Sequence, residues 1–194
     1  MPDFFDVVRS QRGVRYYAPD PVPDDVVEQV IRAATWAPSG GNVQPWSFIV
    51  IRDTDVKRKL GELYRAGGAA GRGDAPPAPV TGDGPFTFSE DMTMVSVLIM
   101  CCMVRGTPRG RAALLGASIF PAVQNLMLAA AALGLGTRLT TIWQHKDDDV
   151  RALLGLPEDI DAMALIPIGY AAPPDHLGGS KRKPIAEVIH YDRW

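Results

Sequence analysis

Apolar side chains recur at helical spacing in several stretches of this chain, with polar positions between them. In residues 24–36 the apolar residues are Val26, Val27, Val30, Ile31 and Ala34. This 3.6-residue period predicts a helix, and the acidic residues of its first turn favour a helix N-terminus there. Pro38, Gly40 and Gly41 end it. Comparable patterns predict helices over 3–11, 56–65, 112–133 and 147–154.

Four short apolar runs predict β-strands, over residues 47–51, 95–104, 138–143 and 162–170. Runs of this length are typical of strands inside a sheet, so 47–51 is expected to be a short buried strand and 95–104 the central one. Long stretches separate the strands, and their connections need not be simple crossovers. The pattern predicts an α+β fold of three layers, with helices around a small sheet, in one domain over 1–194.

Two segments differ from this pattern. Residues 66–84 are rich in Gly, Ala, Pro and Asp, and no complete domain stands on either side of them. We therefore predict a mobile lid, over about 66–89, rather than a linker. The last residues, about 184–194, are predicted to form an extended arm.

The most apolar predicted helix, 112–133, is long enough to be compared with a membrane span. It contains Ser118, Pro121, Gln124 and Asn125, and a Gln–Asn pair is costly among lipid tails. We predict instead a helix buried on most sides, in the core or between two subunits. Small Ala and Gly residues would allow close approach there.

The composition is that of a globular protein. The 194 residues are 46% hydrophobic and 22% charged, and the formal net charge of −2 gives no broad basic surface for nucleic acid. Cys101 and Cys102 are neighbours on a predicted strand, where a disulfide between them would be strained. We expect buried thiols in a reducing, cytoplasmic compartment. The N-terminus shows no basic region followed by an apolar stretch, as a signal peptide would.

Basic residues near the two ends of the chain are candidates for binding an anion. Arg12 and Arg15 flank Gly13, next to Gln11, and Arg182 stands in a Lys-Arg-Lys-Pro run. A phosphate monoester needs guanidinium forks and backbone donors, and a glycine lets the backbone approach closely. A solvated basic helix end gives the same pattern, so both interpretations stay open at this point.

Two further segments place polar groups beside apolar ones. The first is the turn with Pro38, Ser39, Gly40 and Asn42, where a helix ends and hydroxyl and amide groups precede a strand. The alternative is a structural turn in which Ser and Asn bond to their own backbone. The second comprises Thr140, Thr141 and Ile142, which offer hydroxyls or amides, or else fill a strand as β-branched residues.

Signals for other chemistries are missing from the sequence. No G-x-x-x-x-G-K-[ST] loop is present, and no G-x-G-x-x-G follows a strand. The three histidines lack metal-ligand spacing, and no serine stands in a G-x-S-x-G elbow. The sequence thus argues against phosphoryl transfer, a metal site and serine hydrolysis.

These segments together resemble the FMN-dependent nitroreductase family. The family's Arg-Arg-Ser-x-Arg-like motif corresponds to Gln-Arg-Gly-Val-Arg at 11–15, and its Ala-Pro-Ser-x-x-Asn-x-Gln-Pro-Trp turn is complete at 37–46. Further matches follow in the family's order: Gln-Asn-Leu at 124–126, Gly-Leu-Gly-x-x-Leu-Thr-Thr at 134–141, Ile-Pro-Ile-Gly-Tyr at 166–170 and Arg-Lys-Pro at 182–184. The resemblance runs almost from end to end.

The resemblance implies an intertwined homodimer with a small mixed sheet in each subunit and two FMN sites at the interface. Helix 112–133 would form the dimer seam, and the C-terminal arm would wrap the partner. The implied cofactor-binding residues are, at the phosphate, Gln11, Arg12, Gly13, Arg15 and Arg182; at the ring border, from the partner, Pro38, Ser39, Gly40 and Asn42; and, facing N5 and O4, Thr140, Thr141 and Ile142.

The implied activity is hydride transfer from NADH or NADPH, through bound FMN, to a small electrophilic acceptor such as a nitroaromatic or quinone, by a ping-pong mechanism. The flavin carries the redox chemistry, so no side chain is nominated as a catalytic acid or base. The alternatives are a flavin carrier or sensor, an apo structural dimer, and the family's reductive dehalogenases or flavin-fragmenting members. The predicted lid lacks an obvious Glu, Tyr and Lys set for clamping a zwitterionic amino acid, which argues against dehalogenation.

The sequence departs from the family pattern in two places. Gln11 replaces the motif's first Arg and Gly13 its Ser, so phosphate contacts are expected to be fewer or shifted. Many members also carry an Asn and a Lys near flavin N1 and O2, and no such pair is present in 53–84. Arg138 or a backbone amide is the substitute that the sequence offers.

Overall fold

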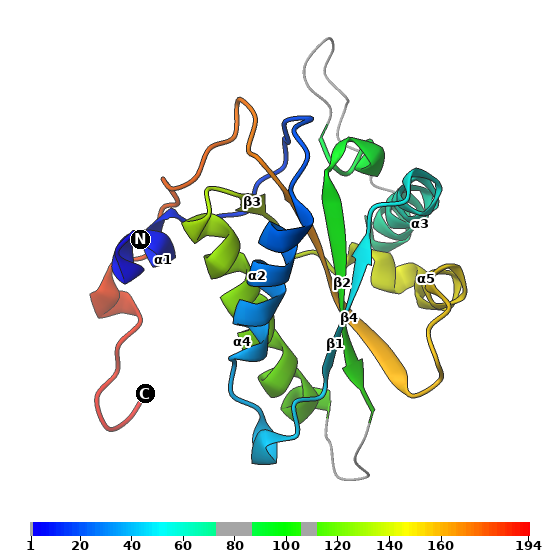
Figure 1. Ribbon diagram of the computed structural model, residues 1–194. Coiled ribbons are helices and arrows are strands. Elements are labelled where there is room, and N and C mark those ends of the chain that lie inside the picture. The colour runs from blue at the N-terminus through cyan, green and yellow to red at the C-terminus, as the bar shows by residue number, and fades with distance from the viewer. Residues whose placement is uncertain (1, 73–86, 106–111) are drawn as a thin grey trace.

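A four-stranded sheet lies between two layers of helices in the computed structural model, which describes residues 2–72, 87–105 and 112–194 (Figure 1). The α-helices are α1 (Phe4–Ser10), α2 (Asp24–Thr35), α3 (Thr54–Arg72), α4 (Ala112–Ala132) and α5 (Asp147–Leu154). The strands are β1 (Trp46–Ile51), β2 (Val97–Val104), β3 (Gly136–Thr137) and β4 (Ile160–Gly169). The predicted α+β class and three layers are confirmed.

The strand order is β1-β2-β4-β3, and every strand pairing in the described residues is antiparallel. Parallel pairing, expected from a mixed sheet, is confined there to one isolated bridge between Gly13 and Thr137. β2 is central and almost wholly buried, as predicted. The predicted strand at 47–51 is confirmed as β1, but its predicted burial was wrong, because β1 lies at the sheet edge and exposes Ser47 and Val50.

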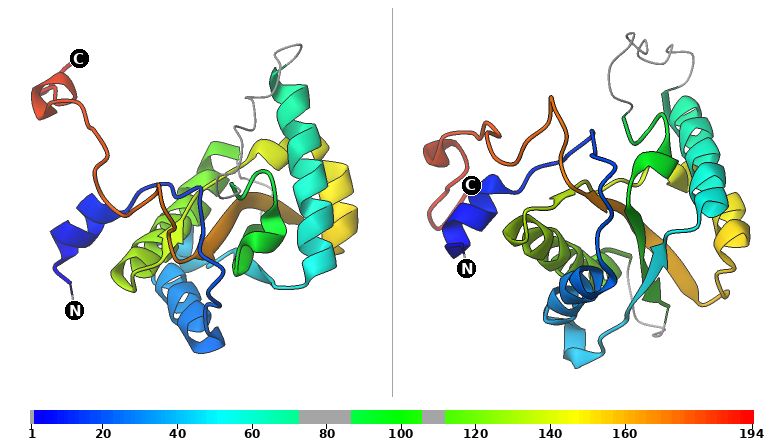
Figure 2. Two further views of the ribbon diagram at one scale, coloured as in Figure 1. Left: turned by 90° about the horizontal axis from the view of Figure 1, so that it is seen from above. Right: turned by 45° about the horizontal axis from the view of Figure 1, so that its top comes forward.

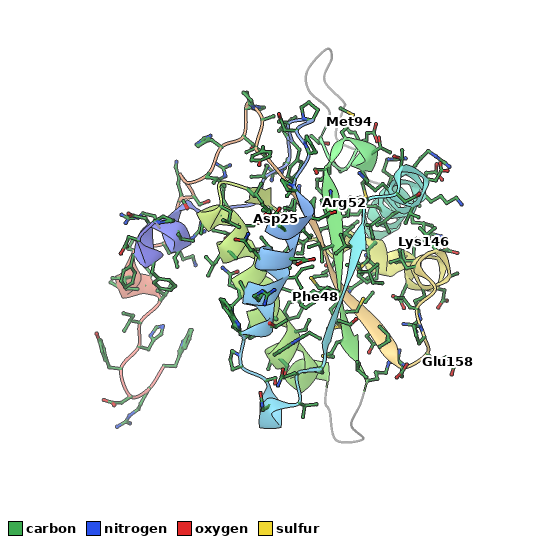
Figure 3. The ribbon with its side chains drawn as sticks, in the orientation of Figure 1. Asp25, Phe48, Arg52, Met94, Lys146 and Glu158 are labelled. Atoms are coloured by element: carbon green, nitrogen blue, oxygen red, sulfur yellow. The ribbon has the colours of Figure 1, made fainter. Side chains whose placement is uncertain are left out.

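Each face of the sheet has its own apolar core. α2 and α4 cover one face, where Val97, Ile99, Cys101 and Met103 of β2 are buried. α3 and α5 cover the other, where Leu98, Met100 and Cys102 are buried (Figure 3). This alternation follows the two-residue period of a strand. It places the two cysteines in different cores as free thiols, and burial raises the pKa of Cys102 to about 11.

The helix ends follow local signals. The Asp3 carboxylate accepts hydrogen bonds from the Phe5 and Asp6 amides and so caps α1. After α4, Gly134 adopts a positive φ of 78°, the left-handed conformation that glycine favours at a helix C-terminus. No helix in the described ranges is both long and apolar enough to span a bilayer.

The predicted strand over 138–143 was wrong. β3 ends at Thr137, Thr140 makes a single bridge with Leu165, and a 3₁₀ segment, η3 (Ile142–Lys146), follows. Trp143 is fully buried, and the 3₁₀ turn brings its side chain into the core under α3. Tertiary packing has overridden the β propensity of the apolar run.

The predicted lid began too early. α3 continues to Arg72, so 66–72 is helical, because Gly67 lets the helix lie directly on η3. Residues 73–86 of the predicted lid lie outside the described part of the chain. Thr87 forms a bridge with Tyr16, and a 3₁₀ turn, η2 (Met92–Met94), leads into β2.

The two chain ends extend away from the three layers on the same side of the molecule (Figure 2). α1 exposes Phe4 and Phe5, and the C-terminal segment exposes Tyr191 and Trp194. That segment contains one 3₁₀ turn, η4 (Ile185–Glu187), and is otherwise irregular, in keeping with the predicted arm.

The approach of α3 to η3 can be tested with two glycines of the same helix. A Cβ built on Gly67 would stand 2.6 Å from the Ile142 carbonyl oxygen, whereas one built on Gly61 would stand 3.3 Å from the Arg65 guanidinium and 3.5 Å from Met92. We expect Gly67→Ala to lower the free energy of unfolding by about 1–3 kcal/mol. Gly61→Ala should change it by less than about 1 kcal/mol, since alanine favours the helix. Urea unfolding measures both, and equal values would contradict the close approach.

Candidate active site

The N-terminal loop that carries the predicted basic residues is fixed to β3. The Val14 amide donates to the Thr137 carbonyl at 2.9 Å, beside the parallel bridge from Gly13. The buried Val14 side chain lies so close to Gly136 that a Cβ there would stand 2.7 Å from it. Packing therefore requires a glycine at position 136. The close approach of Val14 to Gly136 places Arg12 and Arg15 at the end of the sheet.

The segment after β4 lies along the same loop, which brings residues 172–178 next to residues 10–16. The Gly178 amide donates to the Ser10 carbonyl at 2.6 Å, and Arg12 Nη1 donates to the Gly178 carbonyl at 3.1 Å. The Asp175 carboxylate accepts from the Arg15 and Tyr16 amides. Its nearest guanidinium is that of Arg12.

Arg182, three residues beyond Gly179, continues this segment. Its side chain is exposed and donates to the carbonyl of its neighbour Lys181 at 3.0 Å. Arg182 thus lies on the irregular segment that follows the contact with the N-terminal loop, and its role toward a phosphate stays a prediction.

Arg138 adds a further guanidinium at the same place. It directly follows β3, its Cγ lies 3.8 Å from where a Gly13 side chain would begin, and its guanidinium lies 5.3 Å from the centre of the Phe88 ring. The Phe88 amide donates to the Arg15 carbonyl at 3.0 Å. Arg138 therefore lies between the N-terminal loop and the segment of Phe88 that leads into η2. A cation–π contact with Phe88 holds its guanidinium there.

Tyr17 lies beneath this cluster and is neutral. Its hydroxyl donates to the Val14 carbonyl at 3.0 Å, inside the core. Burial raises the pKa of Tyr17 far above its ordinary value, and the positive charge of Arg138 opposes this shift only in part. We call Arg12, Arg15 and Arg138, which stand on adjoining segments of the chain, the guanidinium cluster; the Asp175 carboxylate lies 3.9 Å from Arg12.

The Ser39 turn has the internal bonding of a structural turn. Ser39 Oγ accepts from the Gln44 amide at 3.0 Å, and Asn42 Oδ1 accepts from the Gln44 side chain at 3.2 Å. Asn42 has a positive φ of 55°. The Gly40 amide donates to Ser118 Oγ on α4 at 3.3 Å, which fixes the turn to that helix, and Pro38 is exposed.

The turn and the basic loop lie at opposite ends of one subunit (Figure 1). The Ser39 turn contacts α4 at Ser118, whereas the Gln11 side chain contacts Met127 of the same helix at 3.8 Å. These two positions are about 14 Å apart along the helix axis at 1.5 Å per residue. One subunit does not bring Pro38, Ser39, Gly40 and Asn42 together with Arg12 and Arg15.

Thr140, Thr141 and Ile142 follow β3, next to the basic cluster in the chain. Thr140 is buried, both its backbone groups pair with Leu165, and its hydroxyl shares a 3.0 Å hydrogen bond with the Tyr64 hydroxyl. Thr141 and Ile142 are half-buried at the start of η3. The hydroxyl of Thr140 is therefore directed into the core, while its neighbours lie nearer the surface.

Sequence reasoning missed Asp175 entirely and treated Arg138 only as a substitute. The signal for Arg138 was present, since it follows the Gly-Leu-Gly-Thr run that pairs with the basic loop. Asp175 stands in an Ala-Pro-Pro-Asp-His run without helical or strand periodicity. Nothing local distinguishes it from any other loop carboxylate.

The fold and these residues define an α+β protein with a guanidinium cluster where its chain ends meet. A family model described as the nitroreductase family matches residues 8–170. The chain therefore belongs to the nitroreductase family and is an oxidoreductase.

Individual relatives agree with this assignment. A provisional NADH dehydrogenase/NAD(P)H nitroreductase of Archaeoglobus fulgidus is 25% identical over 196 residues, which cover 100% of both chains. An iodotyrosine deiodinase of Danio rerio is 45% identical over 60 residues, 31% of this chain and 20% of the relative. A crystal structure of a provisionally named nitroreductase of Desulfovibrio desulfuricans in complex with FMN has a TM-score of 0.74 and 25% identity, covering 100% and 99% of the two chains.

The buried hydroxyl pair next to the cluster gives a test of its structural role. We expect Thr140→Val and Tyr64→Phe each to lower the free energy of unfolding by about 1–3 kcal/mol, because each leaves one buried hydroxyl without a partner. The double variant should cost less than the sum, since neither hydroxyl remains. Denaturant unfolding of the four proteins measures this, and strict additivity would show that the two hydroxyls do not interact.

Proposed function

We propose that this oxidoreductase binds FMN and transfers hydride from NADH or NADPH to a small electrophilic acceptor, a nitroaromatic or a quinone, by a ping-pong mechanism. The observation that carries the proposal is the guanidinium cluster of Arg12, Arg15 and Arg138 at the junction of the chain ends. FMN, when bound, supplies the hydride-accepting and hydride-donating chemistry.

The donor set of the cluster fits a phosphate monoester. Such a group carries nearly two negative charges and several acceptor oxygens, which match planar guanidinium donors. Arg15 is exposed, Arg12 and Arg138 are half-buried, and the contacting carboxylate, Asp175, offsets only part of their charge. In this proposal Arg182 adds a further guanidinium from the segment that follows Gly179.

A second copy of the chain would complete the site. The Ser39 turn lies at the far end of α4 from the cluster, so only another subunit can bring the two together. Several large apolar side chains are exposed, including Trp36, Val43, Phe120 and Leu133, in addition to those of the two chain ends. Exposed apolar area of this kind is typical of a subunit interface. This supports a homodimer with α4 at its seam.

In the proposed site the residues of the chain bind and orient rather than exchange protons. The cluster holds the phosphate, and Pro38, Ser39, Gly40 and Asn42 of the second copy border the ring. Thr141 and Ile142 face its polar edge with hydroxyl and amide groups. Thr140, whose hydroxyl is bonded to Tyr64, supports them from below. No catalytic acid or base is assigned.

Reductive dehalogenation of a halogenated tyrosine is the second candidate. It is favoured by the 45% identity to the Danio rerio iodotyrosine deiodinase over 60 residues. Release of iodide from 3-iodotyrosine by the reduced protein decides between the two acceptor classes. Tight flavin binding with negligible NADH oxidation in the presence of menadione would instead indicate a carrier or sensor.

Flavin binding is the first measurement. We expect the purified protein to bind FMN, seen as quenched flavin fluorescence, and Arg12→Ala and Arg182→Ala each to weaken binding by about 1.5–3 kcal/mol, the value of a charge-assisted hydrogen bond. Arg58→Ala is the matched control, because Arg58 lies on the exposed face of α3 in ion pairs with Asp55 and Glu62. Unchanged affinity in both site variants would remove the phosphate assignment.

The shared site predicts complementation between two defective variants. A Cβ on Gly40 meets no atom of the described residues within 4 Å, so Gly40→Val should fold normally yet block the ring site of the partner. Arg12→Ala removes the phosphate contact. Co-expressed, the two variants form mixed dimers with one intact site, so about one quarter of all sites should bind FMN under random pairing. Recovery no greater than in either variant alone would refute a site shared between two subunits.

A further inference from the structure

The Asp175 carboxylate connects two segments that are remote in the sequence. Its Oδ2 atom accepts from the amides of Arg15 and Tyr16, the latter at 3.2 Å. Its Oδ1 atom lies 3.9 Å from Arg12 Nη2, and only 9% of the side chain is exposed. This carboxylate thus contacts both ends of the Arg12–Arg15 segment of the N-terminal loop.

We propose that Asp175 is the positioning residue of the anion site. It fixes the Arg12–Arg15 segment of the N-terminal loop so that the two guanidiniums converge on the phosphate. This inference rests on the proposed function. Arg12, Arg15 and Arg138 are like charges on adjoining segments, so a site that gathers them needs its backbone held in place. Asp175 holds that backbone by accepting hydrogen bonds from two of its amides.

The remaining contacts of this loop show why a hydrogen-bond acceptor is needed at this position. The Val14 amide is bonded to Thr137, and the Arg15 carbonyl accepts from Phe88, so the N-terminal loop is held at its centre and on one side. Asp175 accepts from the next two amides, those of Arg15 and Tyr16. Arg12 is held at Gly178 through one nitrogen, which leaves its remaining N–H groups for a ligand. Asp175 therefore acts through the arginines rather than by touching the phosphate.

Two substitutions separate acceptor geometry from charge. Asp175→Asn keeps an oxygen that can accept from both amides, whereas Asp175→Ala removes it. We expect Asp175→Ala to raise the dissociation constant for FMN about tenfold or more and Asp175→Asn to change it less than about threefold. Glu158→Ala, on the exposed loop before β4 at the other side of the molecule, is the matched control (Figure 3).

Riboflavin provides the readout that a general structural defect would not give. It has the same ring as FMN and no phosphate, so its affinity should be equal in the wild-type protein and both Asp175 variants. Loss of riboflavin and FMN affinity by the same factor overturns the positioning role, because the variant has then damaged the site as a whole. An Asp175→Ala protein that binds FMN as the wild type does also overturns it. So does an Asp175→Asn protein as defective as Asp175→Ala.

The same variants separate this inference from the proposed function. In ligand-free protein, amide hydrogen exchange at Arg15 and Tyr16 should accelerate in Asp175→Ala and stay slow in Asp175→Asn. If the wild-type protein binds no FMN, the proposed function fails, and inorganic phosphate becomes the probe. Phosphate should then raise the melting temperature of the wild type and Asp175→Asn but not of Asp175→Ala. Equal shifts in all three proteins, or unchanged exchange, would refute the role of Asp175.

Discussion

The site depends on one close approach, between the N-terminal loop and β3. Val14 is fully buried against Gly136, and its amide pairs with Thr137 at 2.9 Å. Guanidiniums cannot gather unaided, because like charges repel. Here an apolar contact and a backbone hydrogen bond fix the segment of Arg12 and Arg15 beside β3, which Arg138 directly follows, so the stability of the core holds three basic residues on adjoining segments.

The regular elements were predictable wherever one local pattern decided the outcome. The helical period gave α2 and α5 almost to the residue, and the continuous apolar run gave β2. The prediction failed at 138–143, where β-branched residues favour a strand but the burial of Trp143 under α3 requires a 3₁₀ turn. It failed again at Gly67, because a glycine in a loop-like composition serves here as the contact point of a helix. Both errors come from contacts between segments remote in the sequence.

The candidate site was predictable to the same extent. Residue type and spacing marked the basic residues of the N-terminal loop, whereas their role and that of Arg182 toward a phosphate stay predictions. Asp175 could not, because its function depends on contacts with Arg12 and Arg15 that no local pattern records. The direction of the Thr140 hydroxyl was likewise fixed by Tyr64, on a different helix. Residue type identified candidate groups, whereas the packing of other elements determined where each one points.

The position of the Ser39 turn connects the proposed dimer to the proposed site. Within one subunit the turn and the cluster lie at opposite ends of α4, as Gly40 and Gln11 contact it near Ser118 and Met127. In a twofold dimer, a contact from one copy's turn to the other's cluster is made twice. An antiparallel pairing along α4 would satisfy both contacts and cover Phe120, which is exposed on that helix. Dimerisation and completion of the site would then be a single event, and the cofactor would stabilise the dimer because only the dimer binds it fully.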